Sequence, residues 1–247
     1  MQKNYRYQSI KKVIRKTIIV VFLFVFGLSF TQNQKDSLHL KFNLIWKNEP
    51  LKLNKIYASK SDTLQLTMLK FYVSAIAINY TDESTYNQKN SYHLIDIEDV
   101  NSLTIPVCKK LNKAISKITF CIGVDSLASV SGALSGDLDA TKGMYWAWQS
   151  GFINLKIEGK STSCKTRKNE FQFHIGGYLQ PNYAIKRVEI LLKQDSLVKV
   201  SAIELPINVD LAKLFNAILL SEINAIMIPG KKAMDIASLT TKMFSIE

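Results

Sequence analysis

Apolar and polar residues alternate along most of the chain after residue 36. The segment Ser37–Trp46, with the sequence SLHLKFNLIW, places every second residue on one apolar face and leaves His39 on the polar face. Side chains of a β-strand point alternately to its two faces, so this period of two predicts half-buried strands. Further short strands are predicted within residues 91–97, 117–124, 153–159, 171–175, 184–192 and 197–207.

The same period assigns the faces of the predicted strands. In 153–159 it places Ile153, Leu155 and Ile157 together, and in 171–175 it turns His174 away from the apolar face. The apolar segment 64–80 is too long for an ordinary strand, which predicts either one strand with a bulge or two successive strands.

Helical spacing is confined to the C-terminal part of the chain. In VDLAKLFNAIL, residues 209–219, apolar side chains recur at the spacing of one helix face, with Asn208 or Asp210 as the N-cap. A second short helix is predicted at 232–239, after Pro229 and Gly230. We therefore predict a mainly β protein: an antiparallel β-sandwich or barrel-like single domain with one or two short helices near the C-terminus.

The first thirty residues have the composition of a signal peptide. A basic leader, residues 1–16, precedes the apolar run TIIVVFLFVFGLSF at 17–30, which is short for a membrane span. We expect cleavage between about Ser29 and Gln32, giving a signal peptide at 1–30 and one β domain at 31–247. The alternative is an uncleaved membrane anchor. Cleavage predicts a periplasmic or secreted protein with no stable membrane insertion.

Charge and cysteine content narrow the functional classes. The leader carries six Lys or Arg residues and no carboxylate, so its removal lowers the formal charge from +12 to +6. No basic block with interleaved aromatics indicates nucleic-acid binding. The three cysteines suggest one disulfide in an exported protein, with Cys108 and Cys121 as one pairing, although Cys121 alternatively is a buried thiol.

The segment Gly136–Phe152, GDLDATKGMYWAWQSGF, has the most unusual composition in the chain. In an extended conformation Met144, Trp146 and Trp148 share one face, and Tyr145 lies on the other. A thioether beside two indole rings is a soft, electron-rich surface that suits a soft cation such as Cu(I). Core packing is the alternative. Asp137 and Asp139 lack the spacing of a calcium loop and predict turn or helix capping.

Taken in order, ITFCIGVDSLASVSGALSG at 118–136, the segment above, FINLKIEGKS at 152–161 and FQFHIGGY at 171–178 resemble the MbnP-like family. LKFYVSAIAI at 69–78, SYHLID at 91–96 and the closing KMFSI extend this resemblance over the mature chain. The family consists of periplasmic copper-binding proteins related to the copper-repressible surface proteins of methane-oxidising bacteria.

The resemblance implies a copper site built from a histidine and a tryptophan oxidised to kynurenine, with the oxidation carried out by a MauG-type di-haem partner enzyme resembling cytochrome c peroxidases. The matching histidine is His174. The matching tryptophan is Trp146 or Trp148, with Trp146 the first choice because it follows the GMY turn. Some relatives have a second histidine near the modified tryptophan, but this chain has none between Tyr145 and Gln172, and Trp148 is one residue for that place. A two-histidine site needs His93 or His39, and a site without the modification uses Met144.

No catalytic motif is present, so the chain is predicted not to be an enzyme. The sequence contains no GxSxG, HExxH, P-loop or dinucleotide-binding glycine pattern. Two other interpretations remain beside copper binding. One is a metal-free interaction or adhesion module with the same fold. The other is a carbohydrate-binding β-sandwich that stacks sugars on Trp146 and Trp148, which requires those rings to be exposed.

Overall fold

The computed structural model describes residues 37–109, 113–132, 134–146, 151–192 and 204–246, and their strands form two larger sheets and a small hairpin. In the five-stranded sheet, β17, β15, β1 and β2 follow one another, and β7 also pairs with β1. Its strands are β1 (Ser37–Trp46), β2 (Glu49–Pro50), β7 (Thr104–Lys109), β15 (Glu204–Asp210) and β17 (Phe244–Ser245).

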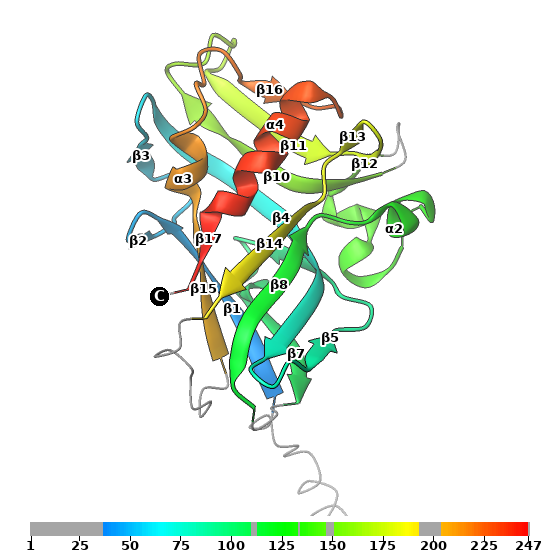
Figure 1. The fold of residues 1–247 in the computed structure, drawn as a ribbon. Helices are drawn as coiled ribbons and strands as arrows, with labels where there is room; N and C mark the ends of the chain where they lie inside the picture. Colours follow the sequence, from blue (N-terminus) through cyan, green and yellow to red (C-terminus); the bar gives the residue numbers. More distant parts are fainter. Residues whose placement is uncertain (1–36, 110–112, 133, 147–150, 193–203, 247) are drawn as a thin grey trace, which may run out of the picture. The chain divides into compact units, whose positions relative to one another are not determined.

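The ten-stranded sheet has the order β14-β8-β4-β10-β11-β16, with β3, β5 and β6 paired to β4 and β9 paired to β10 (Figure 1). Its strands are β3 (Ile56–Ala58), β4 (Thr63–Tyr80), β5 (Thr85–Asn87), β6 (Tyr92–Asp96), β8 (Ile115–Ile122), β9 (Tyr145–Trp146), β10 (Gly151–Ser161), β11 (Glu170–Gly176), β14 (Lys186–Leu191) and β16 (Ala225–Ile226). The hairpin consists of β12 (Tyr178–Leu179) and β13 (Asn182–Tyr183).

These elements confirm the predicted mainly β, sandwich-like fold. Most strand pairs are antiparallel, but β1 pairs with β15 and β11 with β16 in parallel. Strand β15 begins at Glu204, and the preceding part of the predicted strand at 197–207 lies outside the described residues. Parallel pairs join segments that are distant in sequence, which local alternation does not reveal.

The main hydrophobic core collects the alternating apolar faces of both sheets. Phe42 of β1 contacts Phe71 of β4 and Phe120 of β8, with ring centroids 6.4 and 5.8 Å apart. All three rings are almost fully buried. Helix α4 (Lys231–Thr240) adds Ala233 and Ile236 to this core and packs beside β11 and β14.

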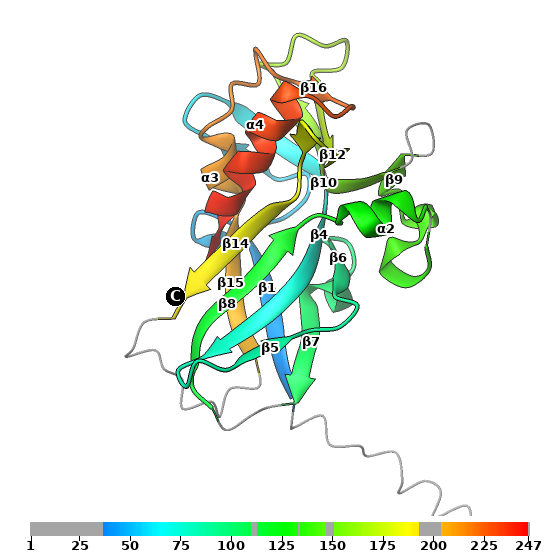
Figure 2. The same cartoon turned by 45° about the vertical axis from the view of Figure 1, so that its right-hand side comes forward.

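A second, smaller hydrophobic cluster lies on the opposite face of β4 and β10. On β4, Phe71 and Val73 belong to the main core, whereas Tyr72 between them belongs to the second cluster. Its members are Tyr72, Leu94, Val124, Ala128, Leu138, Met144, Trp146, Phe152 and Ile153. Figure 2 shows α2 (Ser126–Val130) and β9 together, on the side of the sheet away from α4.

Two bulges change the faces predicted from the sequence. Strand β4 is one strand of 18 residues with a register shift between Ser74 and Ala77, where Ala75 has a positive φ of 49°. In β10 the register shifts between Ile153 and Leu155. The prediction that Ile153 shares a face with Leu155 is therefore wrong, because the bulge turns Ile153 into the second cluster.

The helices agree in part with the sequence pattern. Only α3 (Leu211–Phe215) forms from the predicted helix at 209–219, capped by Asp210, whose Oδ1 accepts the Ala212 N–H at 3.0 Å. Helix α4 (Lys231–Thr240) includes the second predicted helix, at residues 232–239. Helix α2 was not predicted, because five residues show no helical period. The 3₁₀ turns are η2 (Val100–Leu103), η3 (Gly136–Leu138), η4 (Ala140–Lys142) and η6 (Thr241–Met243).

The predicted disulfide between Cys108 and Cys121 does not form. Cys108 lies on β7 of the five-stranded sheet and Cys121 on β8 of the ten-stranded sheet, and both are free thiols, as is Cys164. Burial raises the pKa of all three thiols. Cysteine count alone does not fix the distance between two thiols.

The predicted signal peptide at residues 1–30 lies outside the described residues. Among the residues that the structure describes, no helix has the length and apolar character needed to cross a membrane.

Candidate metal and tryptophan site

Residues 123–146 cover the second face of the large sheet and form most of the second cluster. Three short helical turns hold this segment in place, and aspartates cap two of them. The Asp125 side chain accepts the Ala128 N–H at the start of α2, and Asp139 accepts the Thr141 N–H at the start of η4. The predicted capping role is therefore confirmed for Asp139. Asp137 instead accepts the Leu94 N–H at 3.1 Å and pairs with Lys142 at 2.9 Å, which ties the segment to β6.

Trp146 packs directly on the backbone of Gly176. A Cβ atom at Gly176 would lie 2.7 Å from Trp146 Cζ3 and 2.6 Å from the Phe152 carbonyl oxygen, so only glycine leaves room for the indole. Trp146 is 6% exposed. A stacking platform for sugars requires an exposed ring, so this burial argues against the carbohydrate interpretation for Trp146. The second tryptophan of the motif, Trp148, lies outside the described residues.

His174 lies on the same face of β11 as Gly176, two residues away. Residues two apart on a strand are separated by roughly 7 Å, so the imidazole is a near neighbour of the site where Trp146 packs. The sequence predicts the face of His174 correctly but not its burial, since only 7% of the residue is exposed. The residues of β10 nearest to His174 on this face are Lys156, directly opposite it, and Glu158.

The Glu158 carboxylate orients the His174 ring. Nε2 of His174 lies 2.8 Å from Oε1 of Glu158. A carboxylate accepts hydrogen bonds, so Nε2 carries the proton and Nδ1 of the neutral ring keeps its lone pair. Burial lowers the pKa of His174 and the Lys156 ammonium lowers it further, although the hydrogen bond and charge of Glu158 act in the opposite direction. The ring is therefore neutral at neutral pH, which is the form that binds metals.

Met144 is fully buried in the same cluster as Trp146. Its carbonyl accepts the Ile153 N–H at 2.8 Å, which fixes the strand β9 against β10. The predicted shared face of Met144 and Trp146 is consistent with their membership of one cluster. Tyr145, predicted on the other face, is partly buried against the edge of this cluster and packs on Phe152.

The structure does not bring His93 to His174. His93 lies opposite Val73, on the face of β6 that points toward the main core, and its Nε2 is 2.8 Å from Gln88 Oε1. Strands β6 and β11 are separated by three strand spacings, or about 14 Å. Two nitrogens bound to one ion lie within about 4 Å of each other, so these histidines do not share a metal. His39, on β1 of the five-stranded sheet, instead contacts Ser37.

His93 lines a polar groove of about 380 Å³ between β6 and β7. Two ion pairs neutralise most of the charge in this groove: Lys70 with Asp96, at 2.8 Å, and Lys142 with Asp137. Burial lowers the pKa of His93, and the Asp137 charge acts in the opposite direction. Within the described residues there is no group of three or more His, Cys, Asp or Glu side chains that would hold a metal ion.

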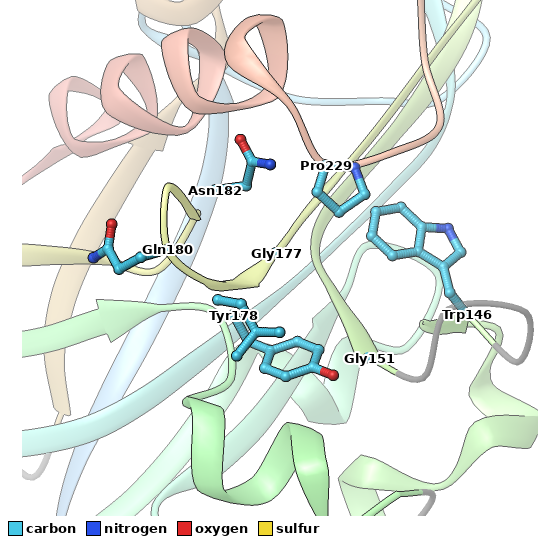
Figure 3. A pocket seen from close by; sticks show the side chains of 8 residues that line it. Trp146, Gly151, Gly177, Tyr178, Gln180, Asn182 and Pro229 are labelled. Carbon is cyan, nitrogen blue, oxygen red and sulfur yellow. The ribbon is translucent and has the colours of Figure 1, made fainter.

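A pocket of about 260 Å³ opens beside Trp146, and the sequence does not predict it. Figure 3 shows the indole at one side of this pocket, near Pro229, with the Tyr178 ring on the opposite wall near Gly151. The β12–β13 hairpin supplies the remaining lining residues. Gly177 precedes this hairpin with a φ of 130°, and a Cβ there would lie 2.2 Å from the Asn182 carbonyl oxygen. The glycine pair that follows His174 is the sequence signal for this close approach.

The fold and this face describe a class of protein: a β-sandwich whose second face carries a buried tryptophan next to a carboxylate-oriented histidine. The family model for MbnP matches residues 35–228, and the chain belongs to the MbnP family. A solved structure, MbnP from Methylosinus trichosporium, has the same fold with a TM-score of 0.54 and 14% sequence identity. The match covers 79% of this chain and 82% of that one. No curated protein matches the chain.

Proposed function

We propose that this member of the MbnP family is an exported copper-handling protein that binds copper at His174, beside Trp146. The proposal rests on one observation. His174 is buried, neutral and hydrogen-bonded through Nε2 to Glu158, and it stands two residues from the glycine on which Trp146 packs. A carboxylate that fixes the ring and tautomer of a histidine is the usual outer partner of a metal-binding imidazole.

The described donors fit copper in part. His174 offers one nitrogen lone pair, at Nδ1, and Met144 is a soft donor in the adjoining cluster. Lys156 opposes the binding of a cation, because its ammonium lies next to Glu158, at 3.8 Å, and lowers the pKa of His174. An unmodified indole is a poor ligand. The site is therefore more complete if Trp146 is converted to kynurenine, whose ketone and aromatic amine are both potential ligands.

The proposed modification requires a partner. Ring opening adds two oxygen atoms to the indole, with dioxygen or peroxide as the oxidant, and gives N-formylkynurenine. Hydrolysis by one water then releases the formyl group as formate and leaves kynurenine. A MauG-type di-haem enzyme would carry out the oxidation. The pocket beside Trp146 gives the buried indole a route to the surface. Bound copper would supply redox or transport chemistry. The chain's own contribution is to orient His174, to hold Trp146 over Gly176 and to shield both from water.

Native protein from the periplasm tests both parts of the proposal. The expected result is bound copper and a peptide containing Trp146 whose mass reflects net replacement of one carbon by one oxygen. His174→Ala is expected to lose the copper, whereas His39→Ala and His93→Ala keep it, because His39 lies on the five-stranded sheet and His93 on the main-core face of β6. Glu158→Gln is expected to weaken copper binding by about 10- to 100-fold.

A metal-free interaction module is the second candidate function. The absence of a three-ligand group among the described residues and the pocket beside Trp146 favour it. Native protein with intact tryptophan and no copper, which also fails to take up added copper, would support this alternative. If copper binds equally well to the wild-type protein and to His174→Ala, the site proposed here is wrong even though the protein binds the metal.

A further inference from the structure

Two connections meet at the end of the large sheet where β10 ends. The turn before β4, residues 59–63, lies beside the connection between β10 and β11, residues 160–170. The Ser161 hydroxyl donates to the Thr63 carbonyl at 2.7 Å, and Ser161 pairs with Leu64. Figures 1 and 2 both show these connections at the same end of the sheet. We call residues 59–63 and 160–170 the basic tip.

The basic tip has a large excess of exposed positive charge. It contains five cations, all on exposed residues: Lys60, Lys160, Lys165, Arg167 and Lys168. Its two carboxylates are Asp62 and Glu170. Asp62 is buried and accepts the Leu220 N–H at 3.2 Å, so it does not face the cations in solvent. Over the described ranges, no ion pair includes any of the five cations. Glu170 lies opposite Lys160 in the β10–β11 ladder, so the other four cations carry an excess of positive charge that is available to an external anion.

An apolar surface accompanies these cations. A pocket of about 220 Å³ lies between Lys160 and Lys168, and Leu64 and Ile56 form part of its lining. Ile56 is 68% exposed, which is unusual for a large aliphatic residue on a strand. A free phosphate ion would use the cations but not Ile56. Exposed aliphatic and cationic side chains together match a ligand surface that is both anionic and apolar.

We propose that the basic tip binds the phosphate-bearing headgroups of an anionic lipid bilayer, with Ile56 entering the headgroup layer. Basic side chains near such a surface each contribute favourable binding free energy, and an aliphatic side chain adds to it. The tip and Trp146 lie toward opposite ends of β10, an 11-residue strand of about 30 Å. A protein bound through its tip therefore keeps the pocket beside Trp146 accessible. The proposal does not depend on copper binding.

Vesicle binding of the protein purified from its native cells tests this proposal. We expect binding to vesicles of mixed phosphatidylcholine and phosphatidylglycerol, no binding to phosphatidylcholine alone, and weaker binding as the salt concentration is raised.

The variant Lys165→Gln/Arg167→Gln/Lys168→Gln should bind anionic vesicles on the order of a hundredfold more weakly than the wild-type protein. The matched control, Lys89→Gln/Lys232→Gln/Lys242→Gln, removes three exposed cations elsewhere and should lose much less. Ile56→Ser should weaken binding several-fold, and this loss should persist at high salt.

Three results would overturn the proposal. The first is no binding of the wild-type protein to anionic vesicles. The second is an equal loss in the tip variant and its control, which would assign the binding to total charge. The third is saturable binding of inorganic phosphate that competes fully with vesicles, which would identify a small-anion site. All the substituted residues are exposed, so we expect every variant to fold. Circular dichroism of each variant checks this.

Discussion

The two faces of β4 and β10 differ in how they are built. The main core receives one alternating set of side chains from each of several strands, and its aromatic rings, such as Phe42 and Phe71, pack edge to face. The second cluster depends on one segment, residues 123–146, and on a close contact between Trp146 and Gly176. Many residues contribute to the packing of the main core, whereas the packing of the second cluster depends on a few particular contacts. Stability and the candidate site are therefore separable by mutation.

The largest expected effect comes from the main core. Phe42→Ala should lower the free energy of unfolding by about 3–5 kcal/mol, because it leaves a cavity between Phe71 and Phe120. Chemical denaturation followed by circular dichroism measures this loss. In a Trp46→Phe/Trp148→Phe background, which leaves Trp146 as the only tryptophan, the fluorescence of the folded fraction should remain unchanged, with Phe42→Leu as the milder control. A changed tryptophan spectrum at a small stability loss would show that the two faces are coupled.

A smaller stability loss with a larger effect on the site is expected for Gly176→Ala. The added methyl group meets the Phe152 carbonyl oxygen and the Trp146 ring, so the indole must move. Overpacking of this kind costs about 1–3 kcal/mol. Tryptophan fluorescence and quenching by acrylamide should report a more exposed indole. Gly230→Ala is the control, because a Cβ there meets nothing within 4 Å. Equal spectra for the two variants would contradict the packing of Trp146 on Gly176.

The smallest effect expected is a pH dependence from the buried His174 and the partly buried His93. Burial lowers the folded-state pKa of His93 and His174, so below the ordinary histidine pKa of about 6.5 the unfolded chain binds protons that the folded chain resists. Stability should therefore fall as pH drops from about 7 through 6.5 and below. His174→Gln and His93→Gln should each remove part of this slope in denaturation curves measured from pH 7.5 to 5.5. An unchanged slope in both variants would locate the titrating groups elsewhere.

Period-two alternation predicts the main core well because each strand carries that signal in its own residues. Leu155, Ile157, Phe171 and Phe173 all take their predicted face. The second face is less predictable. The bulge that redirects Ile153 and the short helix α2 leave little local signal. The contact between Trp146 and Gly176 joins residues thirty positions apart, and only the unusual composition of the two segments indicates it.

The histidines show the same limit. His174 follows an apolar strand pattern that predicts its face, but its burial and its bond to Glu158 depend on strand pairing that the sequence does not display. His93 has an equally plausible pattern in SYHLID and lies on the other face of the sheet. A histidine's position within a strand predicts its direction. Whether two histidines meet depends on strand order.

Strand β4 links the two hydrophobic clusters and so determines when the surroundings of Trp146 can form. It pairs with β3, β5, β6, β8 and β10, and successive residues of this one strand supply both hydrophobic clusters. The segment 123–146 has no surface to pack on until β4, β6 and β10 are aligned. The native environment of Trp146 therefore exists only in a chain whose β4, β6 and β10 are already paired. Any chemistry that requires Trp146 in its native surroundings acts on a chain that has already folded.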